Sequence, residues 1–336
     1  MHLRSRWQRL RRDLSFLRQD PRSWRQFARA LRYRVDKNAI RFTAHTFKPL
    51  PPNPEPGSKK LVLFAHYDPL SVVDPYVVHY LREIKALGSE IIFVSGAADL
   101  SQDSAKTLDP FCAAIYSQRT LAMDFGSWNL AWQHLQRAGW CLEDFEQLIL
   151  ANDSVYGPLF PLTEMFDSFQ GADLYGVTES LEIDQHLQSY FLVFDLNVRT
   201  VNFFKRFWKD FRYEVAKQNL IESYEIGLSR RAEAEGLTTV AYIPNSDAQN
   251  ILSQETEHQF REQVLGREVN NTLYLWDVLI SRLRCPFLKT DVAKTNRYGS
   301  VQVEKLDKFL NRYTKYPPGL IKDHLARLRK PPSRPS

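Results

Sequence analysis

Short apolar runs alternate with amphipathic segments along the middle of this chain, and each run stops at polar residues. Residues 60–65, 90–94, about 113–116 and 148–151 lack a helical period, which is typical of strands buried on both faces. Residues 74–87 have helical spacing and end at Gly88, a C-cap residue. Strand, helix and strand at this spacing predict a right-handed βαβ unit with parallel strands.

The alternation continues beyond these elements. It predicts helices over 127–136, 162–169, 200–213 and 224–234, and strands over 173–177, 190–194 and 238–243. The segment 200–213 is rich in Phe and Trp, and we expect these aromatic side chains to lie in the core. The pattern predicts an α/β fold with a mostly parallel sheet.

The composition divides the chain into four parts. Residues 1–48 read as a basic amphipathic helical arm, in which Leu and Trp recur at spacings of three and four. Residues 49–58 form a Pro-rich linker that cannot be helical. Residues 59–245 form the α/β domain, and 246–336 a mainly helical extension with a disordered tail.

Charge is distributed unevenly. Residues 1–41 hold 13 Lys/Arg against 3 Asp/Glu, residues 301–336 hold 9 against 3, and the middle holds 23 against 33. Basic ends with interspersed apolar residues predict attachment to an anionic membrane surface. An arm packed on its own domain, a mobile arm and an RNA-binding arm are the alternatives. The acidic body argues against nucleic acid.

Several classes of protein are excluded or disfavoured. No apolar run is long enough to span a bilayer, and the N-terminus lacks the apolar core of a secretory signal. The three cysteines are widely spaced, which indicates reduced, buried thiols in a cytosolic protein. The motifs GxGxxG, GxxxxGK[ST], GxSxG and HExxH are absent, so dinucleotide, P-loop, common hydrolase and metalloprotease sites are not expected.

Polar residues follow the predicted strands where an open α/β sheet binds ligands. Because parallel strands end at the same edge, these residues are expected to share a cleft: His66, Tyr67, Asp68, Ser95, Arg119, Asp124, Asn152, Asp153 and Ser154. Each has a structural alternative. Asn152–Ser154 could cap the next helix, Arg119 could form a surface ion pair, Asp68 could serve a turn, and His66 could be a core histidine.

The cleft has the groups that a nucleotide-sugar site needs. A diphosphate is held either by Mg²⁺ or Mn²⁺ on a carboxylate, or by cationic side chains. Asp153 could supply the metal ligand and Arg119 the cation.

Five motifs resemble the rhamnan synthesis F family of bacterial glycosyltransferases over about residues 59–245. They are Leu63-Phe-Ala-His-Tyr-Asp68, Asp124-Phe-Gly-Ser-Trp128, Leu150-Ala-Asn-Asp-Ser-Val-Tyr-Gly-Pro-Leu-Phe160, His186-Leu-Gln-Ser-Tyr-Phe191 and Tyr224-Glu-Ile-Gly-Leu228. The resemblance implies a GT-A-like three-layer α/β/α sandwich. It also implies a role in building surface polysaccharide, typically by transfer of L-rhamnose from dTDP-L-rhamnose.

A more distant similarity to family-2-like GT-A enzymes implies roles for two positions. Their Asp-x-Asp motif falls on Asn152 and Ser154, so Asp153 is the one carboxylate left as a metal ligand. Their catalytic base, which deprotonates the acceptor hydroxyl, corresponds to Glu225. The alternative for Glu225 is an acid at a helix N-terminus, favoured by the helix dipole.

The sequence therefore predicts an inverting glycosyltransferase that moves a deoxyhexose onto a polyprenyl-linked saccharide at the cytoplasmic face of the membrane. The donor or acceptor sugar is expected to contact His186, Gln188, Ser189 and Tyr190, each of which could instead serve a β-turn. Trp128 is expected to pack in the core. A catalytically silent glycan- or partner-binding protein of the same fold is the alternative from another class.

Overall fold

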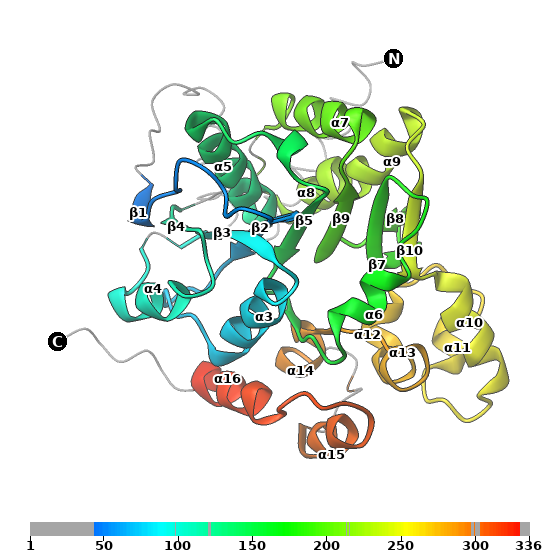
Figure 1. Ribbon diagram of the computed structural model, residues 1–336. Helices are drawn as coiled ribbons and strands as arrows, with labels where there is room; N and C mark the ends of the chain where they lie inside the picture. Colours follow the sequence, from blue (N-terminus) through cyan, green and yellow to red (C-terminus); the bar gives the residue numbers. More distant parts are fainter. Residues whose placement is uncertain are drawn as a thin grey trace, which may run out of the picture.

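A mixed sheet of nine strands crosses the centre of the molecule, and helices cover both of its faces (Figure 1). In this computed structural model the described residues are 44–329, except 98, 120–121, 213, 215, 297–298 and 300–302. The predicted arm up to residue 43 and the predicted tail from 330 lie outside them. The three layers and the mostly parallel sheet confirm the predicted fold class.

The strands follow an order in the sheet that differs from their order in the sequence. They run β1 (His45–Lys48), β4 (Ala114–Ser117), β3 (Ser89–Ser95), β2 (Lys60–His66), β5 (Gln147–Asn152), β9 (Phe191–Asp195), β7 (Leu174–Ser180) and β10 (Thr239–Ile243), while β8 (His186–Leu187) pairs with β7. The parallel pairs are β2 with β3, β2 with β5, β3 with β4, and β7 with β10. β9 runs antiparallel between β5 and β7.

The apolar runs form central strands because both faces of the sheet are covered. In β2, Val62 and Phe64 join the hydrophobic cluster on one face, whereas Leu61 and Leu63 join the cluster on the other. All four side chains are buried. A strand between two helical layers needs apolar residues at every position, which explains why these runs show no alternation.

One face of the sheet is covered by helices from the middle of the chain. They are α5 (Met123–Ala138), α7 (Val198–Lys209), α8 (Lys217–Leu220) and α9 (Ile226–Ala234). The Phe and Trp side chains of α7 lie in this core, as predicted. Trp128 of α5 is fully buried and donates a hydrogen bond from Nε1 to the backbone oxygen of Ala151 over 3.0 Å. Trp128 therefore packs, as expected.

The other face is covered by α3 and by most of the chain after residue 244. These helices are α3 (Pro75–Lys85), α4 (Gln102–Leu108), α6 (Leu162–Asp167), α10 (Asn245–Gln254), α11 (Arg261–Val264), α12 (Asn271–Tyr274), α13 (Trp276–Leu283), α14 (Thr290–Lys294), α15 (Val303–Tyr313) and α16 (Gly319–Arg329). Residues from Val62 to Leu325 share one hydrophobic cluster on this face. The C-terminal helices thus pack into the same core as the sheet.

Some local structure differs from the sequence-based expectation. The last residues of the predicted helical arm form β1, because an extended segment can pair with the free edge of β4. The helix predicted from residue 224 begins at Lys217 and runs through a π-helical turn, η2 (Ile221–Glu225), into α9. A 3₁₀ turn, η1 (Leu142–Asp144), precedes β5. Cys112 and Cys285 are buried thiols as expected, but Cys141 is exposed.

A small second sheet joins the C-terminal segment to the end of β5. β6 (Val155–Tyr156) pairs antiparallel with β11 (Leu288–Lys289). The two segments approach closely at Gly157, where an added Cβ would lie 2.5 Å from the backbone oxygen of Pro286. Only a residue without a side chain fits at this contact, so the glycine allows β11 to lie against the turn after β5.

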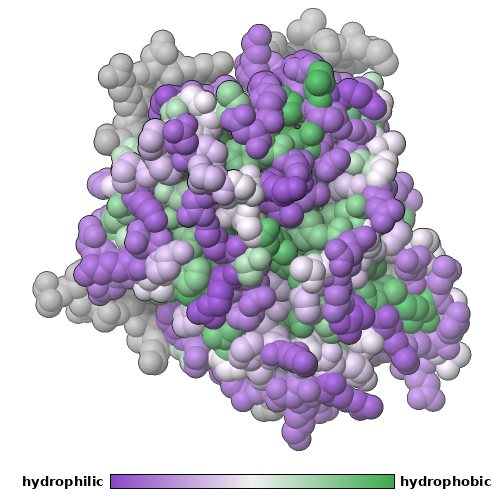
Figure 2. All heavy atoms as spheres, in the orientation of Figure 1, coloured by the Kyte–Doolittle hydropathy of each residue, from purple (hydrophilic) through white to green (hydrophobic). Residues whose placement is uncertain are grey.

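None of the helices in the described residues is long and apolar enough to cross a membrane. Hydrophilic side chains predominate over the face seen in Figure 2, with hydrophobic ones interspersed among them.

Candidate functional site

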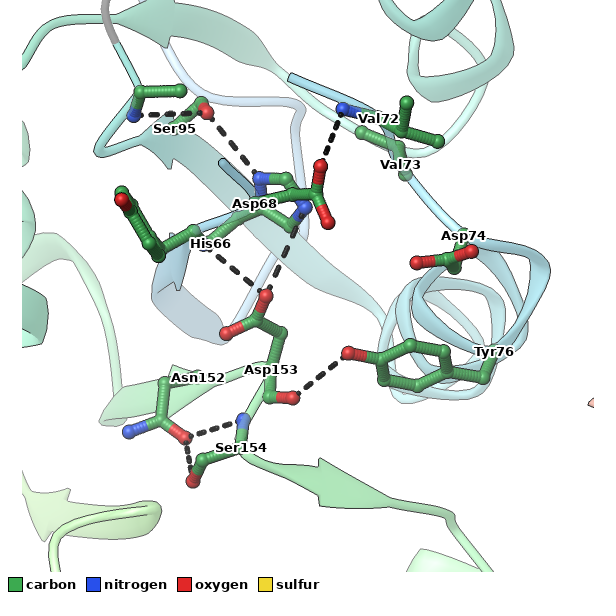
Figure 3. Close-up of polar contacts among 12 residues, drawn as sticks. His66, Asp68, Val72, Val73, Asp74, Tyr76, Ser95, Asn152, Asp153 and Ser154 are labelled. Carbon is green, nitrogen blue, oxygen red and sulfur yellow. Dashed lines mark hydrogen bonds and ion pairs between the residues drawn. The ribbon is translucent and has the colours of Figure 1, made fainter. Parts of the chain in front are cut away.

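Parallel register brings the ends of three strands together. His66 of β2 lies opposite Ser95 of β3, and Ala65 lies opposite Asn152 of β5. Residues that follow these positions therefore emerge at one edge of the sheet, as Figure 3 shows for the ends of β2, β3 and β5. The predicted convergence of strand ends is observed for these residues.

The turn after β5 is held by its own side chains. Asn152 accepts hydrogen bonds at Oδ1 from the backbone N–H and the hydroxyl of Ser154, over 3.1 and 2.6 Å. Its amide nitrogen donates to Oδ2 of Asp124 over 2.8 Å. The segment does not cap a helix, because the two-residue strand β6 follows it. Asn152 instead connects the end of β5 to the first turn of α5.

Asp153 is the carboxylate at the centre of the strand ends. Its Oδ2 accepts a hydrogen bond from the backbone N–H of Tyr67 over 3.1 Å, and its backbone oxygen accepts one from the Tyr76 hydroxyl over 3.0 Å. The side chain is 13% exposed. Burial raises the pKa of Asp153 to about 7, with a smaller contribution from the negative charge of Asp68. This carboxyl group therefore changes its charge near neutral pH.

His66 lies between β3 and the Asp153 carboxylate. Its Nδ1 is 3.3 Å from the Ser95 hydroxyl, and its Nε2 is 3.7 Å from Oδ2 of Asp153. Burial lowers the pKa of His66 to about 4, so the ring is neutral at pH 7. The side chain of Tyr67, by contrast, is 61% exposed beside Asp153. His66 supports the carboxylate, while Tyr67 presents an aromatic ring to solvent.

Asp68 forms part of a buried ion cluster with the C-terminal helix α16. Arg327 donates from Nε and Nη2 to the two oxygens of Asp74 over 2.8 and 2.5 Å, and from Nη2 to Asp68 over 2.5 Å. In the same helix, His324 pairs with the Tyr156 hydroxyl over 2.9 Å. Asp68 also accepts hydrogen bonds from two backbone N–H groups of its own loop. This carboxylate holds the loop after β2 in place.

Glu225 lies in the middle of a continuous helical segment, at the end of the π-helical turn η2. Its Oε1 accepts hydrogen bonds from the backbone N–H and hydroxyl of Ser189, over 2.9 and 3.0 Å. The alternative of a helix N-terminal acid is therefore wrong, because helical residues precede Glu225 from Lys217 onward. π-Helical turns often occur at functional sites, where they move a side chain out of the regular helical register.

Lys289 was not among the residues predicted from the sequence. It ends β11 and faces the ring of Tyr190, with Nζ 4.3 Å from the ring centroid. Glu225, Asp291 and Asp124 act on it electrostatically and favour its charged form, but burial is the largest influence and lowers its pKa. A short apolar run, Phe287-Leu288, precedes Lys289 in the way that apolar runs precede the other strand-end residues. That pattern could have identified it.

Asp124 connects the two acidic parts of the site. Burial and the neighbouring charge of Asp153 raise its pKa to about 7, Glu225 adds to this, and Lys289 opposes it. Asp124, Asp153, Glu225 and Lys289 therefore form one electrostatically coupled group. We call these four residues the charged cluster.

The remaining predicted residues are divided between this site and its surroundings. Ser189 and Tyr190 contact members of the charged cluster. Gln188 is buried and bonded to Thr178 and Asn270, and His186 pairs with the backbone oxygen of Asp184. Arg119 is exposed. Within the described part of the chain, no hydrogen bond or ion pair joins Arg119, His186 or Gln188 to the charged cluster.

No group of three or more His, Cys, Asp or Glu side chains among the described residues is placed to hold a metal ion. Magnesium bound through a substrate diphosphate needs only one or two protein carboxylates, however. Asp153, whose side chain is 13% exposed, could supply one such ligand. The residues present therefore fit only a metal that is shared with a substrate.

The molecule is a three-layer α/β protein with carboxylates at the ends of its strands. Its family follows from the sequence profile described as rhamnan synthesis protein F, which matches residues 91–334. The chain belongs to this glycosyltransferase-like family, as its motifs predict. The match begins within β3, after the first of the five motifs, and continues past the motif region through β11 and α16.

Individual relatives are more distant. The virulence protein VirA of Vibrio anguillarum is 26% identical over 219 residues, which span 61% of this chain and 69% of that protein. The uncharacterized protein y4gN of Sinorhizobium fredii is 23% identical over 188 residues, spanning 54% and 48%. Among solved structures, the galactosyltransferase LgtC with donor and acceptor sugar analogues aligns at 12% identity with a TM-score of 0.34, covering 77% of this chain and 97% of that one.

We predict that Arg327→Met lowers the free energy of unfolding by about 3 kcal/mol, because it leaves the buried carboxylates of Asp68 and Asp74 without their cation. Arg282→Met, which removes an exposed ion pair with Glu255, is the matched control and should cost less than about 1 kcal/mol. Urea unfolding of both variants tests this, and equal losses would contradict it.

We predict that Asp153→Asn stabilises the ligand-free protein, and does so more at pH 8 than at pH 5. The folded-state pKa of about 7 lies above the ordinary value of 3.8, so the stability associated with the bound proton is lost as the pH rises through 7. We expect a gain of about 1 kcal/mol or more at pH 8. Thermal unfolding at both pH values measures it, with exposed Asp247→Asn as control. A gain that does not grow with pH would refute the assignment.

Proposed function

We propose that this protein is a glycosyltransferase that moves a deoxyhexose, L-rhamnose from dTDP-L-rhamnose, onto a growing polysaccharide. The observation that carries the proposal is the charged cluster. In a chain of this family, one carboxylate, Asp153, follows β5 and a second, Asp124, lies in the first turn of α5. A third, Glu225, acts electrostatically on both Asp124 and Lys289. Separated carboxylates allow one group to orient the donor while another accepts a proton.

The proposed reaction is a direct displacement with inversion. The acceptor hydroxyl oxygen attacks the anomeric carbon of the donor, and the bond from that carbon to the diphosphate oxygen breaks. Glu225 takes the hydroxyl proton, and the nucleoside diphosphate leaves with the bonding electrons. The hydrogen bonds from Ser189 support this role because they fix the orientation of the Glu225 carboxylate.

The donor is proposed to lie against the strand ends. Asp153 would hold a divalent ion, Mg²⁺ or Mn²⁺, whose charge neutralises the diphosphate. The exposed ring of Tyr67, the buried groups of His66, Ser95 and Asn152, and the partly exposed Ser154 would shape the nucleotide pocket. Asp68 would act indirectly, by fixing the loop that carries Tyr67. We place the acceptor saccharide beside Glu225, Ser189 and Tyr190, while Arg119, His186 and Gln188 remain proposals that the contacts do not support.

The acceptor is proposed to be polyprenyl-linked and to lie at the cytoplasmic face of the membrane. The basic balance of residues 1–41 and 301–336 supports attachment to anionic lipid. Arg327 is an exception within the second segment, because its charge is used in the ion pair with Asp68 and Asp74.

We predict that Glu225→Gln lowers transfer of labelled sugar from dTDP-L-rhamnose to a polyprenyl-linked saccharide by about 100-fold or more, because an amide cannot accept the hydroxyl proton. Donor binding should change little. Exposed Glu233→Gln, on the same helical segment, is the control and should retain activity. Full activity in Glu225→Gln would remove the assigned base. A wild-type protein that neither transfers sugar nor binds any nucleotide sugar would indicate the catalytically silent alternative, which the single carboxylate of Asn152-Asp153-Ser154 permits.

We predict that a chain lacking residues 1–41 co-sediments less with anionic lipid vesicles than the full chain does, by about tenfold, because 13 cationic side chains are lost. Vesicles of neutral lipid are the control and should bind neither form well. Equal sedimentation of both forms with anionic vesicles would rule out attachment through this arm.

A further inference from the structure

Lys289 occupies an unusual position for a lysine. Its side chain lies over the ring of Tyr190, and β11 holds its backbone against the turn after β5. In the described part of the chain, the Lys289 ammonium has this ring as its contact and makes neither a hydrogen bond nor a direct ion pair. Lys289 is only partly exposed, and a partly desolvated ammonium without acceptors gains from a ligand that supplies them.

The backbone fixes Lys289 next to the predicted donor residues. Lys289 lies opposite Val155 in the pairing of β11 with β6, one residue after Ser154. The backbone N–H of Thr290 donates to the backbone oxygen of Ser154 over 2.8 Å. The close approach at Gly157 brings the same two segments together. The position of Lys289 therefore depends on main-chain contacts to the Asn152–Ser154 turn.

Carboxylates and cations are mixed around this lysine. Asp124 and Glu225 act on Lys289 from α5 and η2, and Asp291 acts on it from α14, while Lys217 opposes them. Lys294, one turn further along α14, acts on Asp153. Segment 289–294 thus brings two cations to an edge that is otherwise acidic. An ammonium with three free donors is a standard ligand for phosphate oxygens.

We infer that the Lys289 ammonium binds the phosphates of the donor nucleotide and supplies resident positive charge for the leaving diphosphate. This inference rests on the proposed function. It gives Lys289 the phosphate-binding role that the sequence predicted for Arg119. It does not depend on a metal, because the ammonium stays in the site whether or not a divalent ion accompanies the nucleotide. Tyr190 has a positioning role here, since its ring face supports the cation.

Calorimetry with dTDP, UDP, GDP and inorganic pyrophosphate tests the inference, each in EDTA and in Mg²⁺. We expect Lys289→Met to weaken the tightest of these interactions about tenfold or more in both buffers, the loss typical of a charge-assisted hydrogen bond. Lys289→Arg, which keeps the charge, should recover part of the affinity. Lys59→Met removes an exposed cation from the residue just before β2, at the opposite end of the strands, and should bind as the wild type does.

A second measurement uses the wild-type chain and so does not depend on the folding of a variant. Reductive methylation followed by mass spectrometry reports how accessible each lysine is. The nucleotide should protect Lys289 and leave Lys59 unchanged. Unchanged labelling of Lys289 at saturating nucleotide, or unchanged affinity in Lys289→Met, would overturn the inference. If transferase activity persists in that case, the proposed function stands. If the wild type binds none of the four probes, both fall.

Discussion

Parallel register between β2, β3 and β5 is the constraint on which the rest of this structure depends. It places His66 opposite Ser95 and Ala65 opposite Asn152, so the polar residues that follow emerge at one edge. Helices bury both faces of the sheet. These polar groups therefore reach solvent at the carboxyl-terminal ends of the strands. The same constraint concentrates negative charge, because Asp124 and Asp153 come from different elements and meet there.

The C-terminal segment supplies the positive charge that this edge lacks. Lys289 enters through β11, and Arg327 enters through α16 to pair with Asp68 and Asp74. The two cations act differently. Arg327 has full carboxylate partners and fixes a loop, whereas Lys289 rests on an aromatic ring and keeps its donors available. Stability and ligand recognition are thus assigned to separate cations from one region of the chain.

The fold and part of the site could be predicted from the sequence because both depend on local patterns. Apolar runs marked the central strands, and small polar residues after them marked Asn152 and Asp153. The rest depends on contacts between distant segments. Nothing near Asp68 shows that Arg327 binds it, and nothing near Glu225 shows that Ser189 orients it. The helix through Glu225 was expected to start too late, because Lys217–Leu220 has too few residues to show a helical period.

The contact between Asp68 and Arg327 joins positions 259 residues apart. During synthesis the sheet strands leave the ribosome long before α16 does, and domains begin to fold from the N-terminal side. Until Arg327 has emerged, the carboxylates of Asp68 and Asp74 have no guanidinium to pair with and favour an open, hydrated loop. The loop that presents Tyr67 to Asp153 therefore reaches its final form only once α16 is available to pair with it. A chain that ended before α16 would lack the guanidinium that fixes the loop after β2.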